Sequence, residues 1–478
     1  MKYYIITYGC QMNKSDSERI ATILEKIGYK SASRENEADL ILINMCSVRQ
    51  SAVDRVYGLI QKLKNLKTKK PGLKTILTGC ILKEDKRKFK KGFDLILNIK
   101  NLPKWPNLLV PNSHDRALYE LEYLNIQPKY QTNFRAFVPI MTGCNNFCSF
   151  CVVPYTRGRE VSRPAKDILC EVKNLIERGA NPIRNAISNG AREIWLLGQN
   201  VNSYHSPIST NMTTNFREYN ISDIRAQIRA DSRVINFAKL LKMVDDISGN
   251  FWIRFTSPHP KDFSDELIET MAKCQKVTPY LNLPVQSGDN EILKRMNRPY
   301  TMGEYKNLVK KIRATFKKYR KAPHQNKFGT GYRLEREIAI STDIIVGFPG
   351  ETKKQFENTV KLFKEIKFDM AYIAKFSPRP GTAAAKLKDN VSPKEKERRY
   401  KILTEILKET ALEKNKKYIG RTIEVLIEAE QGGYLRGKTR NHKTIKFIGP
   451  KNLIGQFVKI KITDALPWGL KGNLIKKS

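Results

Sequence analysis

The sequence predicts an α/β protein with three parts: an N-terminal open parallel α/β domain, a central partial α/β barrel and a small C-terminal β-barrel. Three observations predict this fold class. Apolar runs alternate with helical stretches near the N-terminus, a longer series of the same kind follows, and the C-terminal part holds short β-type runs broken by glycines. Alternating strands and helices are typical of parallel sheets, and closely spaced short strands are typical of small barrels. The expected parts are residues 1–110, a linker at 111–134, the barrel at 135–390, a connecting helix at 391–417 and the small barrel at 418–478.

In the N-terminal part, a cysteine follows each of the first three expected strands. Open α/β sheets bind ligands beyond the carboxyl ends of their strands, so Cys10, Cys46 and Cys80 are expected to converge at one edge of the sheet. A single buried cysteine is commonly a packing residue, but three at equivalent strand ends favour a shared metal site. The expected strands are residues 3–8, 39–44, 74–79 and 93–98, with helices over 14–27 and 51–66.

Six apolar runs separated by helical stretches predict the central barrel. Chemistry in such barrels takes place at the carboxyl ends of the strands, where this sequence places Gln199, Asn200 and Gln286. Two polar stretches, 206–236 and 317–336, interrupt the pattern and are expected to be surface insertions. The expected barrel strands are residues 137–141, 193–198, 252–256, 280–285, 338–347 and 371–376.

The charge of the chain indicates a polyanionic partner. The formal net charge is +40, and residues 418–478 carry 12 Lys and Arg against 4 Asp and Glu. A small basic β-barrel at a terminus is typical of an RNA-binding module, so nucleic acid is the expected partner. An ordinary barrel with a charged exterior is the alternative. The helix expected at 391–417 has apolar residues at helical spacing and should pack on the central barrel.

The expected location is the cytoplasm, without a membrane association. The sequence has no apolar run long enough to span a bilayer, and its start leads directly into a strand-like segment without the features of a signal peptide. Thiols stay reduced in that compartment, so eight cysteines there indicate metal or redox sites more than disulfides. Cys170 and Cys274 lie in helix-like contexts and are expected to be core residues.

The stretch TGCNNFCSFCVVPYTRGRE at 142–160 places three cysteines close together. A structural zinc site needs four ligands, and no fourth cysteine or histidine lies near Cys144, Cys148 and Cys151 in the sequence. Zinc with a distant fourth ligand remains an alternative. An iron–sulfur cluster suits the loop better, because three thiolates on a four-iron cluster leave one iron open to a substrate.

This cysteine spacing, with Phe150 between the last two cysteines, resembles the signature of the radical S-adenosylmethionine superfamily. The resemblance implies that the open iron binds S-adenosylmethionine through its amino and carboxylate groups. One electron then cleaves the C–S bond and releases a 5′-deoxyadenosyl radical.

The whole chain resembles the methylthiotransferase family, which joins a three-cysteine N-terminal domain, a radical barrel and a C-terminal RNA-binding β-barrel called TRAM. Within the family it is similar to the branch that acts on isopentenyladenosine in tRNA. Gln11 and Met12 follow the first cysteine, where the ribosomal-protein branch usually has Pro-Lys and the threonylcarbamoyl-adenosine branch has Lys. The two insertions depart from the family pattern. The matching stretches are TYGCQMNKSDSERI, CSFCVVPYTRGREVSRP, EIWLLGQNVNSY, LNLPVQSGDNEILKRMNR and STDIIVGFPGET.

The resemblance implies methylthiolation of C2 of N6-isopentenyladenosine next to the anticodon of tRNA. It assigns one [4Fe-4S] cluster to Cys144, Cys148 and Cys151 and an auxiliary [4Fe-4S] cluster, also with an open iron, to the three N-terminal cysteines. No catalytic residue is expected beyond the clusters. Candidate contacts to S-adenosylmethionine are Gln199, Asn200 and Gln286, with structural capping of the barrel mouth as the alternative. Tyr155, Arg157 and Arg159 follow the cysteine loop and could contact the substrate or S-adenosylmethionine, with a solvated basic turn as the alternative.

The expected partners are the tRNA anticodon stem-loop, a reductant that donates electrons and a sulfur donor, and the chain is expected to be a monomer. Two rival functions stay open at this point. The same chemistry could act on threonylcarbamoyladenosine in tRNA or on a ribosomal protein. Alternatively, the chain could be a non-catalytic iron–sulfur protein that binds RNA or senses redox state.

Overall fold

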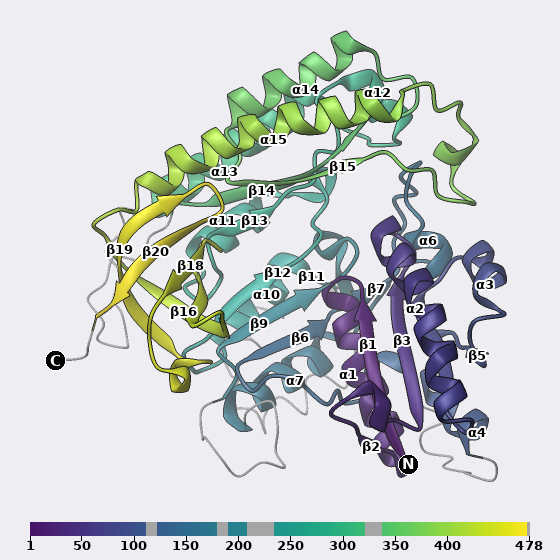
Figure 1. Ribbon diagram of the computed structural model, residues 1–478. Coiled ribbons are helices and arrows are strands. Elements are labelled where there is room, and N and C mark those ends of the chain that lie inside the picture. Colours follow the sequence, from purple (N-terminus) through teal and green to yellow (C-terminus); the bar gives the residue numbers. More distant parts are fainter. Residues whose placement is uncertain (111–121, 179–189, 208–233, 321–336, 476–478) are drawn as a thin grey trace.

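The computed structural model describes residues 1–110, 122–178, 190–207, 234–320 and 337–475. These form the three expected parts, and Figure 1 shows the small C-terminal barrel at the left and the N-terminal domain at the lower right of the central barrel. The two expected insertions lie mostly outside the described residues. At the base of the first insertion, the short strands β10 (His205–Pro207) and β11 (Val234–Asn236) pair in antiparallel fashion.

The N-terminal domain is built on a parallel sheet with the strand order β2-β1-β3-β4-β5. The central strand β3 is buried along its whole length, because it reads as a continuous apolar run and is covered on both faces. The expected fourth strand is present only as the short β5, and β2 was not predicted. The strands are β1 (Lys2–Tyr8), β2 (Lys30–Ser31), β3 (Leu40–Cys46), β4 (Lys74–Cys80) and β5 (Leu95–Ile96), and the helices are α1 (Gln11–Lys26), α2 (Gln50–Lys69), α3 (Lys83–Phe89) and α4 (Trp105–Leu109).

Alternate residues of β3 face two separate apolar cores. Leu40 and Leu42 pack in the core that α1 covers, whereas Ile41 and Ile43 pack in the core that α2 covers. The first core also receives Trp105, which is fully buried, and side chains from the 3₁₀ helix η3 (Tyr123–Asn125). Part of the stretch expected to be a plain linker therefore contributes to the N-terminal core.

Six strands form the central partial barrel in the order of the sequence. β6, β9 and β12 pair in parallel, β13, β14 and β15 pair in parallel, and a parallel bridge between Ile253 and Val277 joins the two groups. The strands are β6 (Arg135–Pro139), β9 (Glu193–Leu197), β12 (Trp252–Phe255), β13 (Tyr280–Asn282), β14 (Ala339–Val346) and β15 (Met370–Lys375).

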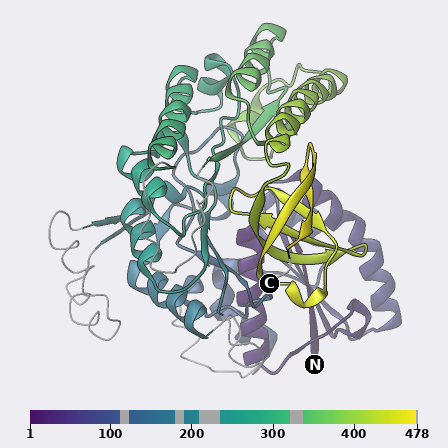
Figure 2. The ribbon, with the colours of Figure 1, turned by 90° about the vertical axis from the view of Figure 1, so that its left-hand side faces the viewer.

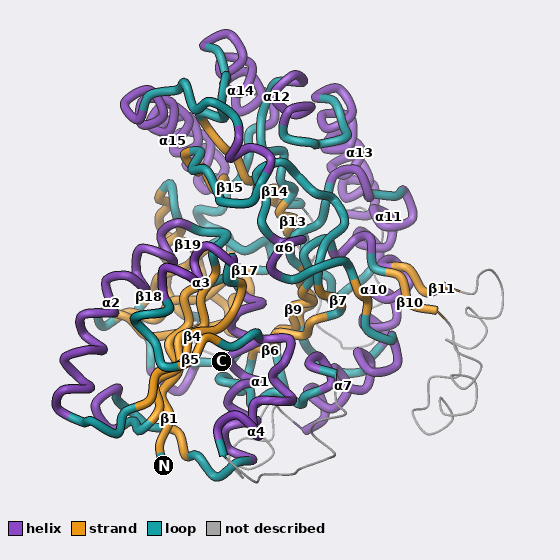
Figure 3. Tube along the Cα trace, turned by 90° about the vertical axis from the view of Figure 1, so that its right-hand side faces the viewer, coloured by secondary structure: helices purple, strands orange, loops and turns teal. Residues whose placement is uncertain are grey.

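Helices cover the outer face of the central barrel (Figures 1 and 3). Ala136, Ile194 and Ile253 are partners in the strand register and belong to the large core beneath these helices. Their neighbours in each strand therefore face the inner side, because strand side chains alternate. The helices are α7 (Ala165–Arg178), α10 (Phe237–Asp246), α11 (Asp265–Lys273), α12 (Asn290–Arg295), α13 (Met302–Arg320) and α14 (Lys353–Ile366).

The N-terminal domain lies against β6 through helix α1 (Figure 3). The Ser15 hydroxyl on α1 donates to the backbone oxygen of Phe137 at 3.1 Å. Met12, from the start of the same helix, packs on Trp195 and Leu197 of β9. These contacts bring the cysteine edge of the N-terminal sheet next to the inner side of the central barrel.

Helix α15 (Pro393–Lys416) connects the central barrel to the small one, as expected. Ser392 caps its N-terminus, Pro393 occupies the first turn, and Leu403 and Leu407 pack in the central core. The small barrel is closed, in the order β16-β17-β18-β20-β19 (Figure 2). Its strands are β16 (Thr422–Gln431), β17 (Tyr434–Thr439), β18 (Thr444–Phe447), β19 (Phe457–Leu466) and β20 (Gly469–Leu474).

The turn between β17 and β18 reaches the inner face of the central barrel. Arg254 on β12 is fully buried, binds Glu193 at 2.6 Å and donates to the backbone oxygen of Thr439 at 2.8 Å. His442 in that turn stacks on Tyr280, with ring centroids 4.4 Å apart. The small barrel is therefore anchored to the interior of the central one. Among the described residues, no helix has the length and apolar character needed to cross a membrane.

Candidate active site

The first cysteine set (Cys10, Cys46 and Cys80) lies at the carboxyl edge of the N-terminal sheet. Cys46 and Cys80 are the last residues of β3 and β4 and are direct partners in the strand register. Cys10 is the N-cap residue of α1, directly after β1. Cys46 and Cys80 therefore lie side by side on adjacent strands, and Cys10 is close enough to both for an electrostatic interaction. The predicted convergence of these residues is therefore present.

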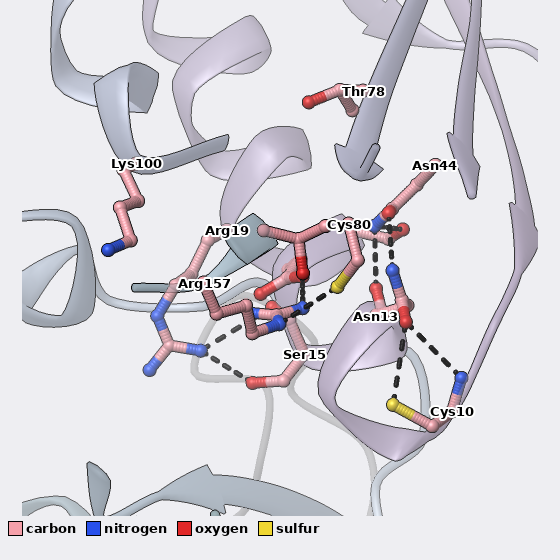
Figure 4. A network of polar contacts seen from close by, with 12 residues as sticks. Cys10, Asn13, Ser15, Arg19, Asn44, Thr78, Cys80, Lys100 and Arg157 are labelled. Atoms are coloured by element: carbon pink, nitrogen blue, oxygen red, sulfur yellow. Dashed lines mark hydrogen bonds and ion pairs between the residues drawn. The ribbon is translucent and has the colours of Figure 1, made fainter. Parts of the chain in front are cut away.

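Two buried asparagines orient Cys10 (Figure 4). The Asn13 side-chain oxygen accepts hydrogen bonds from the Cys10 backbone nitrogen at 3.3 Å and from its Sγ at 3.4 Å. Asn13 in turn donates to the Asn44 side-chain oxygen at 2.9 Å, and Asn44 donates back to the Asn13 backbone oxygen at 2.8 Å. Both amides are fully buried, so this pair fixes the start of α1 relative to β3.

Gly79 allows Cys80 to approach its neighbour. Its φ of +110° is disfavoured for residues with a side chain, and a Cβ there would lie 2.2 Å from the Met45 backbone oxygen. The interaction between the two neighbouring thiols lowers the pKa of Cys46 and raises the pKa of Cys80, while the charge of Arg157 acts to lower the pKa of Cys80. Metal ions and clusters bind the thiolate form, which this environment favours at Cys46.

Arg157 contacts the first cysteine set from the central part of the chain. Its Nε lies 2.9 Å from Cys80 Sγ, and its Nη2 lies 2.6 Å from Asp16 Oδ2. The Tyr123 hydroxyl donates to the other oxygen of Asp16. Burial disfavours the charge of Arg157, but Asp16 and Cys80 hold its pKa well above the ordinary value. This residue, expected to contact S-adenosylmethionine, directs its guanidinium to the first set (Figure 4).

The second cysteine set (Cys144, Cys148 and Cys151) lies in the loop that follows β7 (Met141–Thr142) and ends in α6 (Val153–Thr156). The loop is closed at its base by the pairing of β7 with β8 (Val161–Ser162) and by a bond from the Cys144 backbone nitrogen to the Gly158 oxygen, 3.1 Å. Gly143 has a φ of +82°, and a Cβ there would lie 1.9 Å from the Arg159 backbone oxygen. Only glycine fits this position without moving the backbone.

The middle of this loop is held against the region around α12. Phe150, between the last two cysteines, packs on Met296, Phe348 and Phe376. The Ser149 backbone nitrogen donates to the Met296 oxygen at 2.9 Å. An aromatic residue between two ligands therefore anchors the loop in an apolar cluster.

Arg298 is the counterpart of Arg157 at the second set. Its Nη1 lies 3.5 Å from Cys148 Sγ, and its other nitrogens donate to the Tyr300 hydroxyl and the Pro284 backbone oxygen, each at 2.8 Å. Arg298 is buried, so its charge acts on the sulfur with little screening by water. Burial raises the pKa of Cys151 to about 12, and the charge of Cys148 acts in the same direction with a smaller effect. Binding of a metal cluster would displace that proton.

Three predicted residues lie at the carboxyl ends of the central strands. The Gln199 side-chain oxygen accepts a bond from the Gly143 backbone nitrogen at 2.6 Å, so Gln199 holds the start of the second loop. Asn200 is buried and donates to Asp262 at 2.8 Å, and its side-chain oxygen has no partner within the described residues. Gln286 adopts a φ of +72° and bridges to β14 through its backbone.

The remaining predicted residues lie along the second loop. The Tyr155 side chain is 57% exposed and packs edge-on against Phe147. Arg159 places its guanidinium over the same Phe147 ring, 4.3 Å from the centroid. Of the two cysteines expected to be core residues, Cys274 is buried in the central core and Cys170 is half-buried on α7.

A polar chain on the inner face of β13 and β14 was not predicted from the sequence. Tyr280 shares a hydrogen bond with Ser341 at 2.9 Å, Ser341 donates to Asn282 at 2.8 Å, and Asn282 donates to Asp343 at 2.8 Å. Burial raises the pKa of Asp343, while Asn282 and then Arg49 act to lower it. The alternation of polar residues along β14 was the available sequence signal.

The donor chemistry of both sets fits an iron–sulfur cluster. Each set offers three free thiols, and each has a buried arginine that donates to one sulfur. Such donors stabilise the negative charge of thiolate ligands. Within the described residues, no group of three or more His, Cys, Asp or Glu side chains is arranged to hold one metal ion. A four-iron cluster binds each thiolate at a different iron, so its ligands stand farther apart than those of a single ion.

Three family descriptions match the chain. Residues 2–98 match the uncharacterized protein family UPF0004, residues 138–363 match the radical SAM superfamily, and residues 416–475 match the TRAM domain.

Two solved structures have a low similarity to this chain. The radical S-adenosylmethionine methyltransferase TsrM from Kitasatospora setae is 12% identical, with a TM-score of 0.43 over 80% of this chain and 77% of that one. Coproporphyrinogen III oxidase (HemN) from Escherichia coli is 14% identical, with a TM-score of 0.38 over 71% and 69%.

Curated relatives match over nearly the full length. Proteins named tRNA-2-methylthio-N(6)-dimethylallyladenosine synthase are 39% identical in Clostridium botulinum (strain Langeland), over 99% of this chain and 97% of the relative, and in Thermoanaerobacter sp. (strain X514), over 99% and 93%. The relative of that name from Geobacillus kaustophilus is also 39% identical, over 100% of this chain and 83% of its own length. The chain therefore belongs to the family of tRNA-2-methylthio-N(6)-dimethylallyladenosine synthases, the MiaB family of radical S-adenosylmethionine enzymes.

Proposed function

We propose that this chain converts N6-isopentenyladenosine, next to the anticodon of tRNA, into its 2-methylthio derivative. The observation that carries the proposal is the placement of two separate three-cysteine sets beside one barrel interior, each with an arginine on a sulfur. The identity of 39% with full-length relatives of that name supports it. The C2–H bond of adenine is neither acidic nor readily attacked, so acid–base catalysis has little to offer and a radical route is needed.

The two sets would hold two [4Fe-4S] clusters with different tasks. The second set lies in the loop with the radical S-adenosylmethionine spacing, and the first set would hold an auxiliary cluster. When bound, a cluster with an open iron supplies the electron that cleaves the C–S bond of S-adenosylmethionine. Arg298 and Arg157 would then stabilise the negative charge on the sulfurs of Cys148 and Cys80.

The proposed reaction balances with two molecules of S-adenosylmethionine. The C2–H bond of the base breaks, and its hydrogen leaves as part of 5′-deoxyadenosine, with methionine as the other fragment. A C2–S bond forms to sulfide-level sulfur from a sulfur donor, and the second S-adenosylmethionine gives that sulfur its methyl group and leaves as S-adenosylhomocysteine. One electron from a reductant is consumed in the first cleavage, and one electron is released when the new C–S bond completes the product.

The inner face of the central barrel offers suitable partners for a modified adenine. The polar chain that ends in Asn282 and Asp343 presents amide and carboxylate groups, which are the natural hydrogen-bond partners of a purine edge. Met12, Phe137 and Trp195 form an apolar cluster against Cys10. This cluster surrounds the first cysteine set with apolar side chains on the side that faces the central barrel.

The small barrel carries a basic row suited to the phosphates of tRNA. Arg436, Lys446 and Lys471 are exposed and are register partners on the adjacent strands β17, β18 and β20. Lys446 also lies over the ring of the exposed Tyr434, 3.7 Å from its centroid. A row of cations beside an aromatic ring is typical of surfaces that bind single-stranded RNA. The anticodon loop is single-stranded, so turning one base toward the barrel costs least there.

Mass spectrometry of tRNA nucleosides from a strain that lacks this gene tests the proposal. We expect the 2-methylthio form of isopentenyladenosine to disappear while isopentenyladenosine accumulates, and a plasmid copy of the gene to restore the profile. An unchanged profile, or the selective loss of methylthiolated threonylcarbamoyladenosine, would overturn the proposed substrate. The reductant and the sulfur donor act as separate partners of what we propose to be a monomer.

A further inference from the structure

Arg157 links the two cysteine sets. It follows Cys151 of the second set through the short helix α6, and its side chain ends on the sulfur of Cys80 in the first set (Figure 4). We propose that Arg157 is a positioning residue that fixes the first cysteine set relative to the second and makes a cluster bound there easier to reduce. The inference rests on the proposed function, because it takes the first set to be a cluster site.

The backbone on either side of Arg157 is tied to the second set. The Arg157 backbone nitrogen donates to the Val153 oxygen at 2.8 Å, which completes the turn that begins at the last ligand. The next residue, Gly158, accepts from the backbone nitrogen of Cys144 at 3.1 Å. A shift of the second loop would therefore move the base of the Arg157 side chain with it.

The other end of Arg157 is held by the N-terminal domain. Asp16 on α1 is fully buried and binds Arg157 Nη2 at 2.6 Å, while Nε points to Cys80. Tyr123, from the segment that leads to the central barrel, donates to Asp16. Two directed bonds from one planar guanidinium fix its orientation, which a lysine could not reproduce. The Arg157 side chain thus joins three segments far apart in the sequence: its own, helix α1 through Asp16, and strand β4 through Cys80.

The charge balance at this point favours an anionic partner. Arg157 is 3% exposed, and a buried cation is costly unless anionic groups face it. Asp16 faces the Nη2 side of the guanidinium, whereas its Nε faces the sulfur of Cys80. A thiolate ligand at Cys80 would give the Nε side an anionic partner as well. Hydrogen bonds to the sulfurs are among the factors that set the reduction potential of such clusters.

Arg298 provides the internal comparison. It also donates to a ligand sulfur, Cys148, but its other bonds, to Tyr300 and Pro284, stay within the central barrel. Arg298 therefore serves one set alone, whereas the contacts of Arg157 extend from one set to the other.

The test uses the full-length chain with Cys144→Ala, Cys148→Ala and Cys151→Ala as the parent, so that a reconstituted cluster can occupy only the first set. Its reduction potential is measured by a redox titration monitored by electron paramagnetic resonance. Adding Arg157→Gln should shift the potential to a lower value, because the reduced cluster loses a cation and a hydrogen bond. Arg157→Lys retains the positive charge, so its reduction potential should lie between those of the parent and of Arg157→Gln. The lysine variant replaces Arg157→Gln in the test if the glutamine variant does not fold.

The matched control is Arg163→Gln in the same parent. Arg163 is also buried and binds Glu171 and the Pro139 backbone oxygen, and none of its hydrogen bonds within the described residues goes to a cysteine. Its loss should lower the melting temperature and leave the potential unchanged. Equal potentials in the parent and in Arg157→Gln would overturn the inference. A parent without bound iron and sulfide would instead overturn the proposed function itself, and the inference with it.

A second readout tests the positioning role in the chain with all six cysteines. Pulsed electron paramagnetic resonance on the reduced protein gives the distribution of distances between the two clusters. Arg157→Gln should broaden that distribution, whereas the wild type and Arg163→Gln should share a narrow one. An equally narrow distribution in Arg157→Gln would show that other contacts fix the two sets and would overturn the positioning role.

Discussion

Cys46 and Cys80 lie directly opposite each other at the carboxyl ends of β3 and β4, in a domain separate from the loop that holds Cys148. The two cysteine sets are therefore independent in their ligands, although Arg157 connects them. Independent ligands imply that one set can be removed while the other still binds its cluster. This consequence makes the division of labour between the two sets testable.

Removal of one ligand from each set should give different defects. Cys148→Ala should abolish cleavage of S-adenosylmethionine, because the second set would provide the electron for it. Cys46→Ala should retain at least part of that cleavage and stop formation of the 2-methylthio product. Both are measured by chromatography of 5′-deoxyadenosine and of tRNA nucleosides after anaerobic assay with dithionite.

Cys274→Ala is the control for these two variants, because Cys274 is a buried cysteine of the central core outside both sets. It should keep both activities at a reduced melting temperature. If Cys46→Ala and Cys148→Ala lost S-adenosylmethionine cleavage to the same extent, the proposed division of labour would be wrong.

Gly143→Ala should remove ligand geometry from the second set, whose cysteines it adjoins. The new Cβ would lie 1.9 Å from the Arg159 backbone oxygen, at a φ of +82°, so the start of the cysteine loop must move. We expect the iron content after reconstitution to fall by about half, since four of about eight irons belong to this set. Gly420→Ala is the control, because Gly420 has a φ of +80° but open space around its Cβ position. Equal iron contents in both variants would contradict the close fit described here.

The basic row on the small barrel should govern the salt dependence of tRNA binding. Each phosphate contact contributes a slope of about −0.7 to the log–log dependence of affinity on salt for single strands. Replacing Arg436, Lys446 and Lys471 with Ala should therefore weaken binding and make the slope shallower by about 2, measured by fluorescence anisotropy with an anticodon stem-loop. Lys273→Ala, on the outer helix α11, should change neither quantity. A triple variant with an unchanged slope would place the RNA on another surface.

The buried carboxylate of Glu193 should make the contact between the two barrels sensitive to acid. Burial alone would raise the pKa of Glu193, but Arg254 and Arg135 lower it to about 2 from an ordinary 4.5. The stabilisation is therefore complete above pH 4.5 and is lost as the pH falls from 4.5 through 2, where the carboxyl becomes protonated in the folded state.

Glu193→Gln leaves the buried Arg254 without its anion, whereas Arg135, which is only half-buried, keeps Glu428 as a partner. Loss of the Arg254 partner should cost about 3–5 kcal/mol at neutral pH. Urea unfolding at a series of pH values measures this cost, and the difference from the wild type should narrow below pH 4.5. Glu397→Gln, which removes an exposed partner of Lys375, should have little effect at any pH. A constant difference down to pH 2 would show that the Glu193 charge does not provide the stability.

The order of the elements and the placement of both cysteine sets could be predicted from the sequence, because each signal on which they depend is local. Each cysteine of the first set directly follows an apolar strand-like run, and the Cys-x3-Cys-x2-Cys spacing of the second set lies within eight residues. The element ends were less accurate: α1 begins at Gln11, before the expected start, because Cys10 and Asn13 form its cap. The strand expected at 280–285 extends as β13 only from Tyr280 to Asn282. Just beyond the expected end, Gln286 has a φ of +72°, which a regular strand does not contain.

The partners of the arginines could not be predicted, because they depend on how distant segments come together. Arg157 and Cys80 are 77 positions apart, and Arg298 and Cys148 are 150 positions apart. The short sequence distance from Arg157 to Cys151 favoured a role at the second set. Only the packing of α1 beside β6 shows that the guanidinium of Arg157 lies at the first set.

The iron and acid-labile sulfide content of anaerobically reconstituted protein, measured for the wild type and for each triple Cys→Ala variant, decides whether each cysteine set holds its own cluster. We expect about eight irons and eight sulfides in the wild type, and about four of each when either set is removed. Purified protein that contains zinc and no acid-labile sulfide, or a variant lacking one set that retains the full iron content, would contradict this expectation.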